Sequence, residues 1–408
     1  QIKQHTVTHL ADYLEEFSTQ LESRGVIVHW AKDANDFNNI VLDILQNHGV
    51  KKMVKSKSML TEECAMNPFL ESHGIDVVET DLGERILQLL HQKPSHIVMP
   101  AIHLKREEVG QMFEEKGIST EKGNYDPTYL TQCARKHLRN QFMEAGAGMT
   151  GCNFGVAKTG DIVVCTNEGN ADMSTSMPKL HLVAMGIEKI VPDYKSLAVF
   201  QRLLCRSATG QPTTAYTSHF RQARPGAEMH VILVDNGRSD ILANDEHWET
   251  LKCIRCGACM NTCPVYRRSG GYSYTYFIPG PIGINLGMLH DASRYNDNVS
   301  ACTLCLSCDN VCPAKVNPGS QVYMWRQKLD SLHKANTMKK CMSKGMEELF
   351  DHPQLYSSAL RLAPLANLIP EGLTHIRTLN PWGVAHAMPN FAKESFQTMW
   401  KKGKLKKQ

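Results

Sequence analysis

Two stretches of the sequence, CIRCGACMNTCP at residues 253–264 and CTLCLSCDNVCP at residues 302–313, repeat one spacing of four cysteines. In both, the pattern is C-x-x-C-x-x-C-x-x-x-C-P. Two intervening residues let the backbone curl around one corner of a small metal–sulfur core, so that three thiolates bind three metal atoms. The fourth thiolate must come from elsewhere in the chain. Eight of the fourteen cysteines are assigned in this way.

Bacterial-type ferredoxins hold a [4Fe-4S] cluster with this spacing, and in two-cluster proteins the last cysteine of each run ligates the other cluster. The sequence therefore predicts two [4Fe-4S] clusters. The predicted ligands are Cys253, Cys256, Cys259 and Cys312 for one cluster, and Cys302, Cys305, Cys308 and Cys263 for the other. Since each cluster would join both runs, we expect this region to be poorly folded without iron and sulfide.

Other uses of cysteine match the pattern less well. Structural zinc sites usually pair one C-x-x-C with another a dozen or more residues away, whereas each run here holds four cysteines within eleven residues. Disulfide frameworks are typical of short secreted chains, and this chain has 408 residues and opens without a recognisable leader. We therefore expect a cytoplasmic protein. The six remaining cysteines lack ligand spacing and are predicted to be buried apolar groups, with a redox pair of Cys152 and Cys165 as the alternative. These six are Cys64, Cys133, Cys152, Cys165, Cys205 and Cys341.

The composition is that of a globular protein with two or three domains. Hydrophobic residues make up 42% and charged residues 21% of the chain. A formal charge of +4 is too small to indicate nucleic-acid binding, and no apolar run reaches the roughly 18 residues of a membrane-spanning helix. The end of the chain, KESFQTMWKKGKLKKQ (393–408), predicts a basic amphipathic tail, either solvated or docking on an acidic partner or membrane surface.

Before the cysteine runs, strand-like and helix-like segments alternate, which indicates a parallel sheet covered on both faces. VILVD (231–235) predicts a last central strand, followed by a hairpin turn at Asn236-Gly237. The earlier predicted strands are 26–30, 51–56, 75–79 and 96–99, and the predicted helices are 7–24, 36–49, 58–72, 83–92, 105–116, 127–145 and 194–206. This predicts an α/β domain over residues 1–244. A mainly helical ferredoxin domain over 245–335, including a helix at 316–335, and a C-terminal helical segment with the tail over 336–408 are expected to follow.

Residues 146–186 are rich in glycine and small polar residues. Gly146, Gly148 and Gly151 spell the dinucleotide fingerprint G-x-G-x-x-G, but the fingerprint needs a preceding strand and a following helix, so we interpret the match as coincidental. VAKTGDIVV (156–164) predicts a hairpin that turns at Thr159-Gly160. TNEGN (166–170) follows a strand end, where open α/β sheets place ligands, although these glycines would also serve plain tight turns.

A substrate site in these loops would use charged and polar side chains. Two lysines suit a substrate carboxylate and Glu168 suits a general base. The alternative is that Lys158 and Thr159 only form a turn and that Asp172 caps a helix. The candidates are Lys158, Thr159, Glu168, Asn170, Asp172, Ser174 and Lys179.

Four segments together resemble the lactate utilisation protein B family over roughly residues 5–325. They are GAGMTGCNFGVAKTGDIVVCTNEGN (146–170), PKLHLVAMGIEKIVP (178–192), VDNGRS (234–239) and CIRCGACMNTCPVYRRSGGYSYTYFIPGPIG (253–283). The resemblance implies a three-layer LUD domain, similar to the sugar-phosphate isomerase and CoA-transferase fold, joined to a ferredoxin module with two [4Fe-4S] clusters. It also implies a cytoplasmic complex, with a cysteine-rich protein and a second LUD protein, that oxidises L-lactate to pyruvate.

This resemblance favours an iron–sulfur electron-transfer subunit of an NAD-independent L-lactate dehydrogenase complex. Oxidising a 2-hydroxy acid releases two electrons, whereas a [4Fe-4S] cluster normally carries one, so two clusters suit a relay. The sequence contains no convincing flavin or nicotinamide site. Two alternatives stay open, a self-contained 2-hydroxy-acid oxidoreductase and a binding protein that uses its clusters to sense oxygen or redox state.

Overall fold

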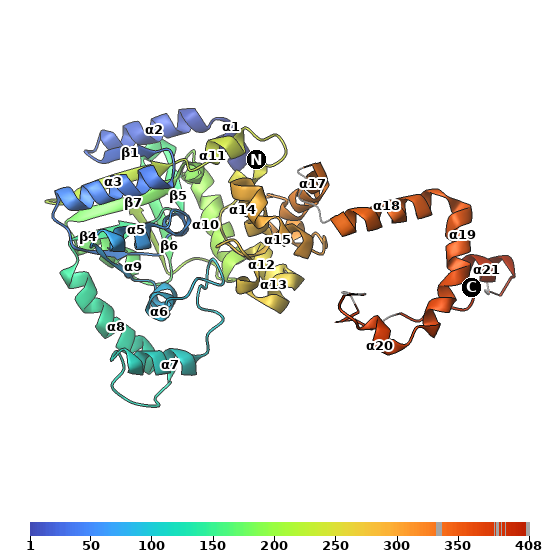
Figure 1. Cartoon of the computed structure of the whole chain (residues 1–408). Coiled ribbons are helices and arrows are strands. Elements are labelled where there is room, and N and C mark those ends of the chain that lie inside the picture. The colour runs from blue at the N-terminus through green and yellow to red at the C-terminus, as the bar shows by residue number, and fades with distance from the viewer. Residues whose placement is uncertain (332–336, 379, 381–382, 385, 388, 405–408) are drawn as a thin grey trace. The chain divides into compact units, whose positions relative to one another are not determined.

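The computed structural model describes residues 1–331, 337–378, 380, 383–384, 386–387 and 389–404 (Figure 1). The chain divides into two compact units, Gln1–Ser331 and Leu332–Gln408. The first unit holds the sheet and both cysteine runs. The predicted boundary at residue 244 therefore lies inside one compact unit.

A six-stranded parallel sheet forms the centre of the first unit. Its order is β1 (Ile27–Ala31), β10 (Glu228–Val234), β7 (Leu180–Gly186), β4 (Ala147–Thr150), β2 (Lys52–Lys55) and β3 (Asp76–Glu79). In β10, Ile232 and Val234 pack on one face while Val231 and Leu233 pack on the other. Because successive side chains point to opposite faces, a strand covered on both sides must be apolar throughout. The predicted parallel α/β sheet is confirmed.

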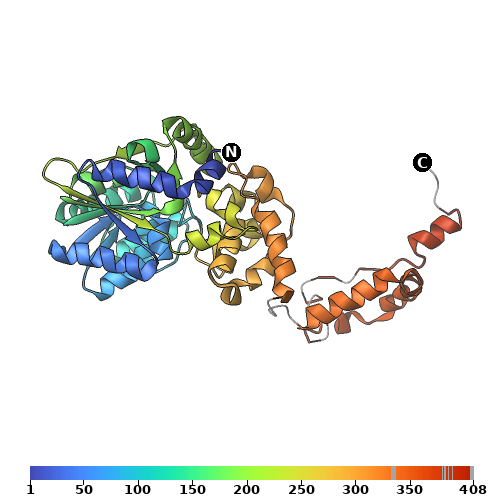
Figure 2. The same ribbon diagram turned by 90° about the horizontal axis from the view of Figure 1, so that it is seen from above.

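Helices cover both faces of this sheet, as Figures 1 and 2 show from two directions. Phe37 of α3 belongs to the core on one face, and Phe17 of α2 to the core on the other. Aspartate side chains accept hydrogen bonds at the starts of α3, α6, α8 and α10, which satisfies otherwise unpaired amides there. The helices before the cysteine runs are α1 (Ile2–Thr8), α2 (Leu10–Glu22), α3 (Ala34–Asn47), α4 (Met59–Glu63), α5 (Met66–Ser72), α6 (Leu82–Leu90), α7 (Arg106–Glu115), α8 (Pro127–Glu144), α9 (Asn170–Ser176), α10 (Tyr194–Ala208) and α11 (Arg238–Leu242).

A second, four-stranded sheet contains the predicted hairpin. Its order is β8 (Ile190–Val191), β5 (Phe154–Val156), β6 (Asp161–Thr166) and β9 (Tyr216–Phe220). Strands β5 and β6 pair antiparallel and are joined by the 3-10 turn η1 (Ala157–Thr159) and Gly160, whose φ is 65°. This confirms the turn at Thr159-Gly160.

Three local predictions are wrong. Residues 96–99 are not a strand: Nδ1 of His96 accepts hydrogen bonds from the amides of Val98 and Met99, which folds the segment back on itself. Asn236-Gly237 is not a hairpin turn, because both neighbours of β10 are parallel to it and the turn leads into α11. The helix predicted at 58–72 is interrupted at Ala65, whose φ is 50°.

Short helices surround the cysteine runs and confirm a mainly helical ferredoxin region. They are η3 (Trp248–Lys252), α12 (Ala258–Thr262), α13 (Pro264–Ser269), η4 (Gly271–Ser273), α14 (Gly280–Tyr295), α15 (Asp297–Ala301), α16 (Ser307–Val311) and α17 (Pro318–Ser331), with η2 (Ile187–Lys189) in the sheet domain. The helix predicted at 316–335 is described as far as Ser331, and 332–336 lie outside the described residues.

The second unit is helical in its described parts. It contains α18 (Thr337–Asp351), α19 (Pro353–Leu362), η5 (Ala363–Leu368), α20 (Glu371–Thr374) and α21 (Phe396–Lys401). The last four residues of the predicted basic tail, 405–408, lie outside the described residues. None of the helices described here or in the first unit combines the length and apolar character needed to cross a membrane.

Candidate metal centre and adjoining cavity

The two cysteine runs repeat in backbone geometry as well as in sequence. Arg255 and Gly257 in the first run have φ of 60° and 79°, and Leu304 and Leu306 in the second have 54° and 56°. A left-handed conformation costs a non-glycine residue roughly 1–2 kcal/mol. In return it turns amides toward sulfur, since Arg255 N–H donates to Sγ of Cys253 and Leu304 N–H donates to Sγ of Cys302, both at 3.4 Å.

Gly257 and Leu306 occupy equivalent positions in different surroundings. A Cβ on Gly257 would lie 3.3 Å from side-chain atoms of His96 and Val98, so the sheet domain approaches the first run closely there. Leu306 is 43% exposed and meets no such constraint. The first run, unlike the second, is therefore built against the sheet domain at this position.

Cysteines from both runs converge, as a cluster that joins the runs requires. Cys253, Cys256, Cys259 and Cys312 line one small cavity. Burial, together with the nearby Cys253 and Cys312, raises the pKa of the Cys256 thiol to about 12, and Cys263 acts in the same direction on the thiols of Cys302 and Cys308. Four thiols around a cavity, with amides donating to sulfur, fit the ligand set of an iron–sulfur cluster.

The segment at 93–104 joins the sheet domain to the first cysteine run. Nε2 of His96 lies 3.0 Å from Oδ1 of Asn261, and the Tyr266 hydroxyl donates to the Ser95 carbonyl at 2.7 Å. The Tyr272 hydroxyl donates to the Lys93 carbonyl at 2.7 Å. These contacts explain why an apolar segment that resembles a strand is instead folded into an irregular connector.

A large cavity lies where the strands of the main sheet end. Its volume is about 620 Å³, and residues just beyond β2, β3, β4 and β7 line it. Open parallel sheets place ligands at this edge. Arg255, which lies between the first two cysteines, contributes to its wall, and Ile97 lines both this cavity and the cysteine cavity. An occupant of the larger cavity would therefore lie beside the first cysteine run.

Buried ion pairs organise one wall of this cavity. Arg238 donates two hydrogen bonds to Glu63, at 2.9 and 3.0 Å, and a third to Glu188 at 2.5 Å. Burial alone would raise the pKa of Glu188, but Arg238 and neighbouring cations hold it at about 2. Nη1 of Arg255 is buried and has no hydrogen-bond partner among the described residues. Nη1 of Arg255 is thus a cationic nitrogen on this wall that could donate a hydrogen bond to a ligand.

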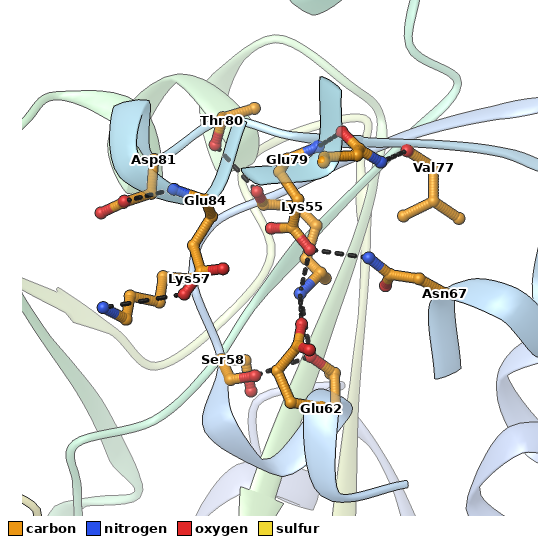
Figure 3. Close-up of polar contacts among 12 residues, drawn as sticks. Lys55, Lys57, Ser58, Glu62, Asn67, Val77, Glu79, Thr80, Asp81 and Glu84 are labelled. Carbon is orange, nitrogen blue, oxygen red and sulfur yellow. Dashed lines mark hydrogen bonds and ion pairs between the residues drawn. The ribbon is translucent and has the colours of Figure 1, made fainter. Parts of the chain in front are cut away.

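A second charged group lies at the ends of β2 and β3, where Lys55 points toward Glu79 and Glu62 and Lys57 toward Glu84 (Figure 3). Nζ of Lys55 is 2.7 Å from Glu79, and Nζ of Lys57 is 3.7 Å from Glu84. Burial raises the pKa of Glu84 to about 8 despite Lys57.

Glu168, on the cavity wall, also has a raised pKa. Burial and the adjacent Asp81 raise the pKa of Glu168 to about 7. A carboxyl group with that pKa can accept or release a proton near neutral pH. The cavity therefore combines a cationic nitrogen with a proton-exchanging group.

Replacing Glu84 by glutamine should flatten the pH dependence of stability. With a pKa of about 8 in the folded protein and about 4.3 unfolded, Glu84 costs stability as pH rises between these values. From pH 6 to 8 the wild type should therefore lose about 2 kcal/mol more than E84Q, measured from urea midpoints. E15Q, at an exposed position on α2, is the control. Equal slopes in E84Q and wild type would contradict the assignment.

The structure brings only part of the sequence-predicted substrate site to the cavity. Glu168 and Asn170 line it. Lys158 and Thr159 lie in the η1 turn, and Asp172 accepts a hydrogen bond from Ser218 at 2.6 Å. The Ser174 side chain is buried, and its hydroxyl has no hydrogen-bond partner in the described part of the chain. Lys179 precedes β7 and thus lies at the opposite end of that strand from the cavity.

Sequence reasoning missed the cations that line the cavity, Lys57, Lys189, Arg238 and Arg255. Lys57 and Arg238 each follow a strand, and this position after a strand could have indicated that they line the cavity. Cys152 and Cys165 line the cavity too. Burial raises their thiol pKa values to about 12 and about 11, which disfavours the thiolate that a redox pair would need.

The glycine fingerprint is not a nucleotide loop. Gly148 lies within β4, and strand β5 rather than a helix comes next. A Cβ on Gly148 would lie 1.7 Å from the Ser174 carbonyl oxygen, so glycine is required by the close packing of α9.

Comparisons with known families agree with a sheet domain that is followed by a cysteine-run region within the first unit. The LUD domain family matches residues 14–241, and the 4Fe-4S dicluster domain family matches residues 249–316. The chain is thus an iron–sulfur protein with a LUD domain.

Similar proteins define the family of this chain more narrowly. Lactate utilization protein B 1 of Bacillus mycoides is 39% identical, covering 98% of this chain and 86% of that protein. Lactate utilization protein B of Bacillus pumilus is 40% identical, covering 100% and 88%. An uncharacterized electron transport protein, YkgF, of Escherichia coli is 37% identical, covering 98% and 86%. The chain belongs to the lactate utilisation protein B family. A crystal structure of a DUF162 family protein from Deinococcus radiodurans aligns with 55% of this chain and 98% of its own, at 13% identity and a TM-score of 0.31.

Proposed function

We propose that this protein is the iron–sulfur electron-transfer subunit of a complex that oxidises L-lactate to pyruvate. The observation that carries the proposal is the convergence of Cys312 with Cys253, Cys256 and Cys259 around one cavity. The names of the relatives from Bacillus support lactate as the metabolite, and the name of the Escherichia coli relative supports electron transport.

Two [4Fe-4S] clusters would be held, one by each crossed set of four cysteines. A [4Fe-4S] cluster accepts and passes on single electrons, and its potential depends on burial and on hydrogen bonds to sulfur. The chain supplies such bonds in both runs. Val316 N–H donates to Sγ of Cys312 at 3.3 Å, and Tyr266 N–H is 3.5 Å from Sγ of Cys263.

The remaining subunits are proposed to be a cysteine-rich protein and a second LUD protein, acting together with this chain in the cytoplasm. A partner would take the electron pair from lactate and deliver single electrons to this chain. The second candidate function is a self-contained 2-hydroxy-acid oxidoreductase. The cavity favours it, since Arg255 offers a cationic nitrogen for a carboxylate and Glu168 offers a base, beside the first cysteine run.

An anaerobic reduction experiment separates the two functions. The isolated chain is reconstituted to about eight iron atoms, mixed with L-lactate, and its EPR spectrum is compared with a dithionite-reduced sample. A relay should be reduced by dithionite and not by lactate. Reduction by lactate alone would overturn the relay and place the dehydrogenase site in this chain. A redox sensor would instead lose partner binding when its clusters are oxidised, and a C302S variant would still support growth on lactate.

A further inference from the structure

Three side chains that could ligate a metal converge at the opposite edge of the main sheet from the cavity. Oε1 of Glu228, the first residue of β10, lies 2.5 Å from Nε2 of His230 and 3.2 Å from Nε2 of His48. One ligand atom from each residue lies within 4.8 Å of the others. The His230 side chain is 6% exposed, whereas those of His48 and Glu228 are 36% and 44% exposed.

The hydrogen bonding of His48 requires a positive charge between its Nε2 atom and the carboxylate of Glu228. Its Nδ1 lies 2.8 Å from the carbonyl oxygen of Ile44. A carbonyl oxygen only accepts, so Nδ1 must carry a proton, and a neutral ring then has a bare lone pair on Nε2. That lone pair faces a carboxylate oxygen of Glu228, and two lone pairs repel. Either a second proton or a cation must therefore lie between them.

His230 completes the arrangement. Its Nδ1 lies 2.9 Å from Nε2 of His29 on the neighbouring strand β1, so His230 can donate Nδ1–H there and leave the lone pair of its own Nε2 toward Glu228. Metal-binding histidines usually donate their second N–H in this way, which fixes the ring.

We propose that His48, Glu228 and His230 bind a divalent transition-metal ion such as Zn²⁺. Two imidazoles and one carboxylate are a ligand set that zinc accepts, with water in the fourth position. The exposure of His48 and Glu228 gives that water access. Of the nearby cations, Lys52 is neutralised by Glu144 at 2.7 Å and Asp76 at 3.7 Å. The bound ion would fasten the end of α3 to β10.

Zinc titration of the cluster-loaded protein tests the site. One Zn²⁺ should bind per chain in competition with a chelating dye, and E228Q and H48A should each weaken binding at least about tenfold. H73A is the matched control, since His73 also ends a helix and places Nδ1 2.8 Å from the carbonyl oxygen four residues earlier, while no carboxylate of the described residues forms an ion pair with it. It should bind as the wild type does.

X-ray absorption at the zinc edge then identifies the ligands. A shell of nitrogen and oxygen at about 2.0–2.2 Å is expected, whereas zinc in the cysteine runs would show sulfur at about 2.3 Å. A sulfur shell, unchanged affinity in E228Q and H48A, or no binding to the wild type would each overturn the proposal. The iron content of every variant is measured in parallel, so that loss of the clusters is not mistaken for loss of this site.

Discussion

Replacing Cys312 by alanine is expected to remove the cluster held by the first cysteine run, although Cys312 belongs to the second run. The protein should keep about four of about eight iron atoms. The physical reason is that Cys312 lines the same cavity as Cys253, Cys256 and Cys259. C263A should remove the other cluster in the same way, because Cys263 lies near Cys302 and Cys308. Iron and sulfide analysis with EPR of the reduced protein measures the loss.

Double variants distinguish crossed from uncrossed ligation. If Cys312 and Cys253 serve one cluster, C253A/C312A should lose no more iron than either single variant, because both changes damage the same site. C302A/C312A should then lose nearly all iron. Uncrossed ligation predicts the reverse pattern. C341A, at an exposed cysteine outside both runs, is the control and should keep all its iron.

The convergence of cysteines from the two runs could be predicted from sequence because the spacing that indicates it is local. Three ligands of each proposed cluster lie within seven residues, and the repeated left-handed positions follow the same spacing. The parallel strands could be predicted equally well, since a strand buried on both faces must be an apolar run. HIVM (96–99) has that same signature, but Ile97 and Val98 pack against the cysteine-run helices and Met99 is exposed, and no periodicity distinguishes this packing from that of a buried strand.

The cavity was harder to predict from sequence, because its residues can be placed together only when the strand order is known. Glu63 ends α4, whereas Glu188 follows β7 and Arg238 follows β10, and hydrogen bonds join the three across 175 and 50 residues of sequence. His48 and Glu228 are similarly distant in sequence. Lys158 and Lys179 are close in sequence to the glycine-rich stretch, yet the first lies in a turn and the second lies at the end of its strand opposite the cavity. Sequence proximity is a poor guide where a parallel sheet collects loops from distant segments.

Replacing Arg238 by methionine should destabilise the protein by about 3–5 kcal/mol, because it leaves two buried carboxylates without their main partner. The side chains of Arg238, Glu63 and Glu188 are 6%, 14% and 3% exposed, so water cannot replace the lost hydrogen bonds. The urea midpoint at pH 7 measures the change. R106M is the control, since the pair of Arg106 and Glu107 lies at the surface and should leave the midpoint unchanged.

Charge balance can be tested by removing the whole network. The triple variant R238M/E63Q/E188Q removes the three charges that these hydrogen bonds join and should recover part of the stability lost in R238M. The recovery should be incomplete, because Lys189, whose Nζ lies 3.9 Å from Glu188, loses its partner. The pH dependence gives a second measure. Because the pKa of Glu188 is held at about 2, below its unfolded value, its contribution is present above about pH 4.3 and is lost as the pH falls toward 2. This acid-sensitive contribution should disappear in the triple variant. If R238M unfolds at the same urea concentration as R106M, the network does not hold this wall of the cavity, and the strand ends must be fixed by packing alone.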